Sequence, residues 1–198
     1  MNCSWTAVLQ VVPEDVFVGS PPLAFTFGLG GLAIFPLRFG AAATLLENAS
    51  PPNMIEIIEK YKVNQFYTAP TAIRSLAKES LEWVEKYDLS SLKVLGSVGE
   101  PINEEAWHWY DEHIGKRNCP IVDTWWQTET GGIMISPIPH VTPTKPTYAT
   151  LPLPGIQPVL LDEQHKEITS NPAQGSLCIK HAWPSMARTI WGDHQRYI

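Results

Sequence analysis

Residues 92–124, LKVLGSVGEPINEEAWHWYDEHIGKRNCPIVDT, hold the pattern that decides the fold. The short apolar runs at 92–97 and 121–124 are typical of buried strands. Between these runs, Asn103 is a natural N-cap and Gly115 a natural stop for a helix. Three large apolar residues fall on one stripe of that helix: Trp107, Tyr110 and Ile114. A strand, a helix and a second strand in this order predict two parallel strands joined by a right-handed crossover.

The same alternation continues toward the N-terminus, where apolar runs at 41–46 and 63–68 predict two more strands. A helix capped by Asn53 is expected between these runs, and a second helix begins near Pro70 and runs with a break toward Tyr87. Because strands alternate with helical patterns, the expected fold class is α/β, with βαβ crossovers in a parallel-sheet subdomain.

The character of the sequence changes in its last third. Seven prolines between residues 137 and 158 exclude long helices there. The runs at 157–162 and 175–180 are typical of two strands around a polar connection. We therefore expect a parallel α/β subdomain over residues 1–147, incomplete at its N-terminus, and the truncated start of a smaller β-rich lobe over residues 148–198.

Bulk composition narrows the classes of function. The chain has 198 residues, of which 44% are apolar, enough to build a core. Its formal net charge is −6 and its Lys and Arg residues are scattered, which argues against nucleic-acid binding and against a polybasic membrane anchor. The most apolar run, at 23–37, is too short to span a bilayer and is interpreted as buried core. Three widely spaced cysteines without a recognisable secretory leader favour a cytoplasmic location.

Three unusual segments follow the predicted strands, at 67–71, 97–101 and 123–132. Ligands of open parallel sheets bind outside the carboxyl ends of the strands, because loops and helix N-termini converge there. In the last segment Glu129 stands between two threonine hydroxyls, an oxygen-rich group that could hold Mg²⁺. The alternative interpretation is a polar turn whose two tryptophans fill the core.

Two of these segments carry a resemblance. DTWWQTETGG at 123–132 and GSVGEPIN at 96–103 resemble the adenylate-forming acyl-CoA synthetase family, and within it the acetyl-CoA synthetase branch. YTAPTAIR at 67–74 and ARTIWGDH at 187–194 support the resemblance in the same order along the chain. The resemblance implies an internal fragment of an AMP-forming acyl-CoA synthetase, covering part of its adenylate-forming N-terminal domain.

Enzymes of that family couple a carboxylate to ATP, releasing pyrophosphate, and pass the acyl group from the acyl-adenylate to the thiol of CoA. The resemblance therefore implies ATP, Mg²⁺ and CoA as co-substrates, with Glu129 as the metal ligand. Val98 and Trp126 would wall the acyl pocket, with Thr26 as a further pocket residue, and a tryptophan there favours acetate or propionate over longer acids. The implied nucleotide site comprises Gly99, Glu100, Pro101, Asp123, Thr124, Trp125, Trp126, Gln127 and Thr128. The expected partners are a small carboxylate and a nucleotide.

Two alternatives stay open. LAFTFGLGG at 23–31 looks more like synthetases for aromatic acids such as benzoate, which leaves the acid undecided. A non-catalytic module that retains an adenine-nucleotide pocket is the rival from another class. The family's phosphate loop, ribose-binding aspartate and adenylation lysine are expected outside this chain, so no complete catalytic set is expected within it. The sequence thus predicts no ligase activity for the fragment alone and leaves its oligomeric state open.

Overall fold

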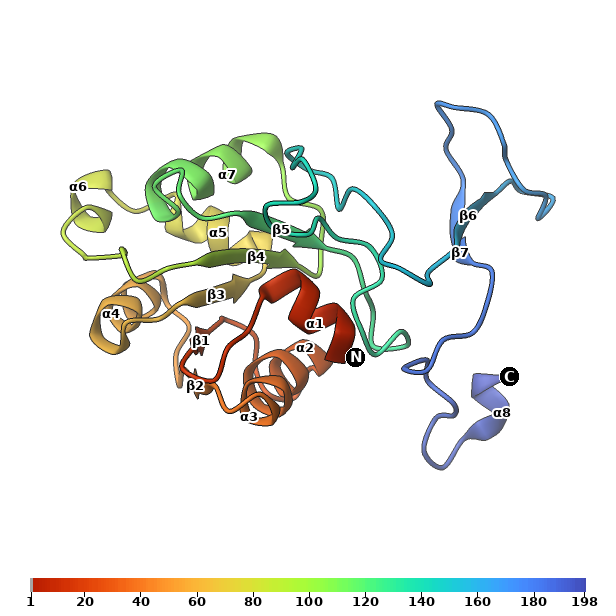
Figure 1. The fold of residues 1–198 in the computed structure, drawn as a ribbon, viewed down its shortest axis with the longest axis horizontal. Helices are drawn as coiled ribbons and strands as arrows, with labels where there is room; N and C mark the ends of the chain where they lie inside the picture. The colour runs from red at the N-terminus through yellow and green to blue at the C-terminus, as the bar shows by residue number, and fades with distance from the viewer. Residues whose placement is uncertain (1) are drawn as a thin grey trace.

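The computed structural model describes residues 2–198 and contains a five-stranded, fully parallel sheet (Figure 1). The strands lie in the order β2-β1-β3-β4-β5. Their bounds are β1 Val16–Val18, β2 Ala42–Thr44, β3 Gln65–Thr68, β4 Val94–Val98 and β5 Ile121–Thr124. The predicted parallel sheet is confirmed. Strand β1 was not predicted, because its apolar run is only three residues long, between Asp15 and Gly19, whereas the equally short β2 lies inside a longer apolar run at 41–46.

Helices cover both faces of the sheet (Figure 1). The first face carries α4 (Pro51–Tyr61), α5 (Pro70–Leu76), α6 (Leu81–Val84) and α7 (Glu104–Trp109), which continues as the π-helical η2 (Tyr110–Ile114). The second face carries α1 (Asn2–Leu9), α2 (Thr26–Leu29), the π-helical η1 (Gly30–Ile34) and α3 (Phe35–Arg38). Adjacent residues of a strand point to opposite faces. Phe66 therefore belongs to the core under α4–α7 and Tyr67 to the core under α1–α3.

The helix predicted after Asn103 is confirmed. Together, α7 and η2 run from the residue after Asn103 to the residue before Gly115, and the three stripe residues are buried. The helix predicted from Pro70 also forms, with that proline in its first turn. Its predicted break is present, because Ser80 starts α6 by accepting a hydrogen bond from the backbone N–H of Trp83.

One local expectation is wrong, and a second holds only for part of its residues, Leu32 and Phe35 among them. The N-cap position of α4 is occupied by Ser50 rather than Asn53, because the helix begins at Pro51, whose fixed φ suits a first helical position. The run at 23–37, expected to be buried core, folds mainly into α2, η1 and α3. Winding into a helix sends only one side of an apolar run toward the sheet, so Leu37 on the other side is 72% exposed.

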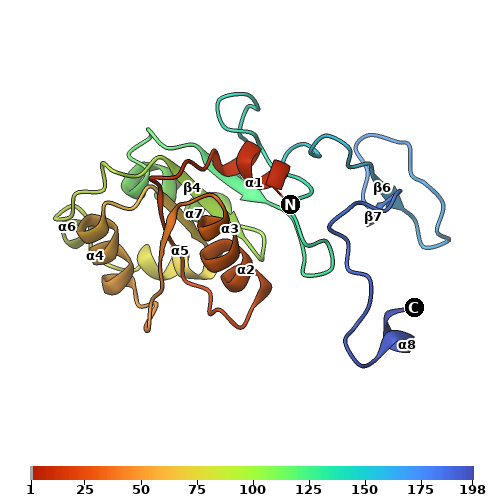
Figure 2. The same ribbon diagram turned by 60° about the horizontal axis from the view of Figure 1, so that its bottom comes forward.

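The last part of the chain lies apart from the sheet in both views (Figures 1 and 2). Strands β6 (Pro158–Leu161) and β7 (Ser176–Ile179) form an antiparallel pair, followed by α8 (His194–Tyr197). The predicted α/β fold with a smaller β-rich part is confirmed. Leu153 and Ile156 pack on the core under α1–α3, and a domain boundary near residue 148 stays a prediction. No helix between residues 2 and 198 is long and apolar enough to cross a membrane.

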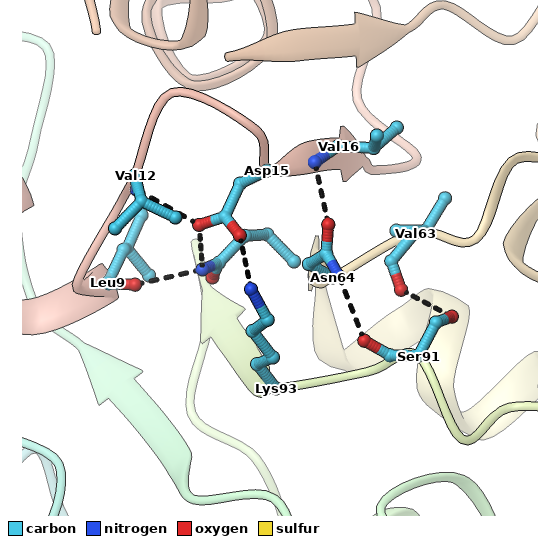
Figure 3. A network of polar contacts seen from close by, with 9 residues as sticks. Leu9, Val12, Asp15, Val16, Val63, Asn64, Ser91 and Lys93 are labelled. Carbon is cyan, nitrogen blue, oxygen red and sulfur yellow. Dashed lines mark hydrogen bonds and ion pairs between the residues drawn. The ribbon is translucent and has the colours of Figure 1, made fainter.

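A buried carboxylate joins the amino ends of three neighbouring strands (Figure 3). Asp15, which precedes β1, is 1% exposed and accepts hydrogen bonds from the Val12 backbone N–H and the Gln65 amide, both at 3.1 Å. Lys93, which precedes β4, donates to the other oxygen of Asp15 at 3.0 Å. Both carboxylate oxygens are thus paired. The network ties β1, β3 and β4 together at their amino ends, opposite to the carboxyl ends where ligands are expected.

We expect Lys93→Met to lower the free energy of unfolding by about 1 kcal/mol, because it leaves the buried carboxylate of Asp15 without its charged partner. The effect is expected to shrink in high salt, since the lysine side chain is 56% exposed. Urea denaturation at two salt concentrations measures both effects. Lys62→Met is the matched control, because its partner Asp88 is itself half exposed and its loss should cause no measurable change. Equal effects from the two substitutions would contradict the prediction.

Candidate functional site

A hollow of about 390 Å³ opens at the carboxyl ends of β4 and β5. Its walls come from the turn after β4, the segment after β5 and residues 147–149. The lining residues are Ser97, Gly99, Glu100, Pro101, Ile102, Asp123, Thr124, Trp125, Trp126, Gln127, Thr147 and Ala149. Every predicted nucleotide-site residue except Thr128 therefore borders one hollow. Its lining includes two carboxylates and neither Lys nor Arg, so it suits a neutral base better than phosphate.

The turn after β4 is built to admit a ligand closely. Gly99 has φ +96°, a conformation that residues with a side chain rarely adopt, and a Cβ there would meet nothing within 4 Å. Glu100 is held by two residues of α5: the Thr71 hydroxyl donates to its carboxylate, and the Arg74 guanidinium donates to the same oxygen at 2.9 Å. The Thr71 hydrogen bond and the Arg74 charge hold the pKa of Glu100 below its usual value. This turn is thereby fastened to the start of α5.

Asp123 is the one buried acid of the hollow. It is 8% exposed, and its Oδ2 accepts a hydrogen bond from the indole N–H of Trp107 at 3.0 Å. Its Oδ1 is also buried but has no hydrogen-bond partner among the described residues. Burial raises the pKa of Asp123 to about 6, against the opposing influence of the Ser97 and Trp107 side chains. An unpaired buried oxygen is costly, so this acceptor is suited to a donor that a ligand brings.

The predicted acyl-pocket residues Val98 and Trp126 belong to the aromatic core on the second face of the sheet. The Trp126 indole lies edge-on to Trp5 and Phe27, with ring centroids 6.0 and 6.2 Å away, and its N–H donates to the Tyr67 hydroxyl at 3.2 Å. Thr26, the third predicted residue, opens α2 and is half-buried. Its neighbour Phe27 is the residue of this segment whose ring packs on Trp126.

The loop after Trp126 is held from two sides. The buried hydroxyl of Thr130 accepts a hydrogen bond from the backbone N–H of Gln127 at 2.9 Å. The Thr130 carbonyl accepts hydrogen bonds from the Trp183 indole and the Ser185 hydroxyl, both at 2.8 Å. The loop that carries Thr128 and the predicted metal ligand Glu129 is therefore fixed against the chain's C-terminal part.

Thr128 and Glu129 are exposed at the tip of this loop. Glu129 borders a second hollow of about 350 Å³, and Trp125 and Gln127 line both hollows, so the two adjoin. Residues 2–198 contain no cluster of three His, Cys, Asp or Glu side chains that could hold a metal by themselves. Mg²⁺ commonly takes one or two carboxylates together with substrate phosphates, and a single exposed glutamate fits an ion that arrives with a nucleotide.

Sequence reasoning missed four residues that line the first hollow: Ser97, Ile102, Thr147 and Ala149. Ser97 begins the 97–101 segment that was predicted at the ligand-binding end of the sheet, but it was not assigned to the nucleotide site. Ile102 lies inside the quoted GSVGEPIN segment but reads as an ordinary core residue. Thr147 and Ala149 come from the proline-rich segment, whose path over the strand tips has no local signature.

A family model described as AMP-binding enzyme matches residues 1–191. The chain belongs to this family. The predicted membership of the adenylate-forming enzymes is thereby confirmed. The chain is 50% identical over 196 residues to an acetyl-coenzyme A synthetase of Coprinopsis cinerea, which covers 96% of the chain and 30% of that relative. It is 53% identical over 188 residues to an acetyl-coenzyme A synthetase of Rhodobacter capsulatus, covering 92% and 29%.

The chain thus spans about 30% of the length of these curated relatives. Among solved structures, it is similar to an anthranilate CoA ligase in complex with anthranoyl-AMP. The TM-score is 0.82 at 27% identity, over 98% of this chain and 37% of the ligase. The relatives therefore include one enzyme group named for acetate and one structure of a ligase for an aromatic acid.

Proposed function

We propose that the chain carries part of the adenylate site of an acid–CoA ligase, which activates a short carboxylate with ATP and transfers the acyl group to CoA. In this proposal the first hollow takes the adenine base. Asp123 Oδ1 accepts a hydrogen bond from the base's exocyclic amine, and the open Gly99 turn lets the base approach the backbone. The observation that carries the proposal is the unpaired, buried oxygen of Asp123, which lines a hollow that has neither Lys nor Arg among its lining residues.

The phosphates are proposed to lie toward the 127–130 loop, where Thr128 and Glu129 reach solvent. Glu129 would hold Mg²⁺ together with phosphate oxygens, and the ion would offset negative charge on the phosphates. The chain's own contribution there is positional, because Thr130 fixes the loop that carries both residues. CoA is proposed as a co-substrate of the whole ligase.

Acetate or propionate is proposed as the acid. The support is the packed ring of Trp126, which contacts three aromatic side chains of the core that also contains Val98: Trp5, Phe27 and Tyr67. The segment at 23–31 favoured an aromatic acid, and the anthranilate ligase is a structural relative. In this chain, however, Phe27 of that segment fills space next to Trp126. A benzoate-sized ring would have to displace one of these two side chains.

Calorimetry of the purified chain with AMP tests the base subsite. We expect binding on the order of micromolar. Inosine monophosphate has a carbonyl oxygen where AMP has the amine, so it would set an acceptor against Asp123 and should bind at least about tenfold more weakly. Equal affinity for the two nucleotides would contradict the placement of the base. Acetate-dependent exchange between ATP and pyrophosphate is expected to be undetectable for this polypeptide alone.

A further inference from the structure

The hydroxyl of Tyr67 lies between two residues of the proposed site. It accepts a hydrogen bond from the Trp126 indole N–H at 3.2 Å and is hydrogen-bonded to the Thr124 hydroxyl. Thr124 in turn lies 3.2 Å from the carbonyl oxygen of Ser97. Tyr67, Ser97 and Thr124 stand at or near the carboxyl ends of β3, β4 and β5, so this chain of hydrogen bonds crosses three adjacent strand tips.

The direction of each hydrogen bond is determined by chemistry. An indole N–H can only donate and a carbonyl oxygen can only accept. Trp126 therefore donates to Tyr67, Tyr67 donates to Thr124, and Thr124 donates to the Ser97 carbonyl. Burial raises the pKa of Tyr67 well above its ordinary value, so the phenol keeps the proton that this sequence requires.

The Tyr67 ring is as constrained as its hydroxyl. The residue is 1% exposed. Its ring lies edge-on to Phe27, with centroids 4.5 Å apart, and to Trp5 at 5.8 Å. The ring also packs closely against Gly96, where an added Cβ would lie only 1.9 Å from a ring carbon. A hydroxyl on a ring with so little freedom is a rigid acceptor for the Trp126 indole.

We propose that Tyr67 is a positioning residue for substrate selection: its hydroxyl holds the Trp126 indole across the acyl pocket and so limits the length of the acid. This inference rests on the proposed function, in which Trp126 walls that pocket. The acid would contact the indole and not Tyr67 itself. Because Thr124 also lines the base hollow, the same hydroxyl links the base and acyl parts of the site.

The competing interpretation is that Tyr67 only stabilises the core. Tyr110 offers a matched control, because it is also fully buried, also hydrogen-bonded through its hydroxyl, to the Phe66 carbonyl at 3.1 Å, and packed in the other core. Tyr67→Phe and Tyr110→Phe each remove one buried hydroxyl and keep the ring. A purely structural role predicts the same behaviour for both variants.

The test measures the affinity of the chain for two non-hydrolysable acyl-adenylate mimics, acetyl- and benzoyl-sulfamoyladenosine. We expect wild type and Tyr110→Phe to bind the acetyl compound more tightly than the benzoyl compound. In Tyr67→Phe this ratio of affinities should fall about fivefold or more, the effect expected from the loss of one hydrogen bond. An unchanged preference in Tyr67→Phe, or an equal loss in Tyr110→Phe, would overturn the inference. If wild type binds neither compound, the proposed function fails instead.

A second measurement does not depend on ligand. Hydrogen exchange of the Trp126 indole N–H, assigned by the signal that disappears in Trp126→Phe, should become several-fold faster in Tyr67→Phe because its acceptor is gone. The rate should stay unchanged in Tyr110→Phe. Unchanged exchange in Tyr67→Phe would show that the hydroxyl does not hold the indole, and would overturn the positioning role whatever the mimics do.

Discussion

Asp123→Asn is expected to make the chain more stable and, at the same time, a poorer binder of AMP. Above pH 6 the carboxylate of Asp123 is charged, buried and paired through only one of its oxygens. An asparagine keeps an acceptor for the Trp107 indole and carries no charge to desolvate. Its amide N–H₂ would then face the hollow, where it meets the adenine amine donor to donor. A gain in stability with a loss of affinity marks a group retained for binding.

The sign of the pH dependence follows from the raised pKa. The carboxyl titrates near 3.8 when exposed and at about 6 in the folded chain. Between these values the folded state binds more protons, so the unfolding free energy of wild type falls as pH rises through this window. The stability gain of Asp123→Asn should therefore be near zero below pH 4 and reach at most about 3 kcal/mol above pH 6. Urea denaturation across this pH range measures it.

Asp15→Asn is the matched control for Asp123→Asn. Asp15 is more deeply buried, but both its oxygens are paired, one of them with Lys93. Removing that charge should destabilise the chain rather than stabilise it, because donors stand at both oxygens of Asp15 and the amide N–H₂ of an asparagine would face one of them. Two buried acids of the same sheet should thus respond to the same substitution with opposite signs. Loss of stability in both variants would contradict the special status of Asp123.

Gly96→Ala is expected to lower the free energy of unfolding by about 3 kcal/mol, at the upper end for overpacking. The new Cβ would lie 1.9, 2.6 and 2.8 Å from three carbons of the Tyr67 ring. That ring cannot move aside, because it is fully buried against Phe27 and Trp5. Displacing it should also disturb the Trp126 indole, so the near-ultraviolet circular dichroism of the folded variant should change.

The control for Gly96→Ala is Gly30→Ala, another buried glycine without a positive φ. The Cβ of Gly30→Ala would come within 3.2 Å of a single Phe35 ring carbon, and alanine suits a helical position better than glycine. Its stability should stay within about 1 kcal/mol of wild type. If the urea midpoint of Gly96→Ala matches that of Gly30→Ala, the Tyr67 ring is more mobile than its packing indicates.

Much of the fold was accessible from sequence. The runs ending at Thr68 and Thr124 are buried on both faces, and such runs need no long-range information to be recognised as parallel strands. Because ligand-binding loops gather at the carboxyl ends of parallel strands, the sequence also predicts that the 97–101 and 123–132 segments lie near one another. Strand β1 was missed because its apolar run is only three residues long, whereas β2 lies inside a longer run. The exposed side of α3 was missed because an apolar run does not show which of its residues other parts of the chain will cover.

By itself, the sequence determined the alternation of strands and helices between residues 41 and 124, the end of the sheet at which polar residues gather, and the family. Local periodicity and short motifs encode these features, because they depend on residues near one another in the chain. Only the tertiary structure decided that one oxygen of Asp123 is unpaired and that Tyr67 receives the indole N–H of Trp126. Burial of Asp123 and hydrogen bonding between residues 59 positions apart depend on which strands are neighbours in the sheet and in what register. No local sequence pattern encodes that pairing.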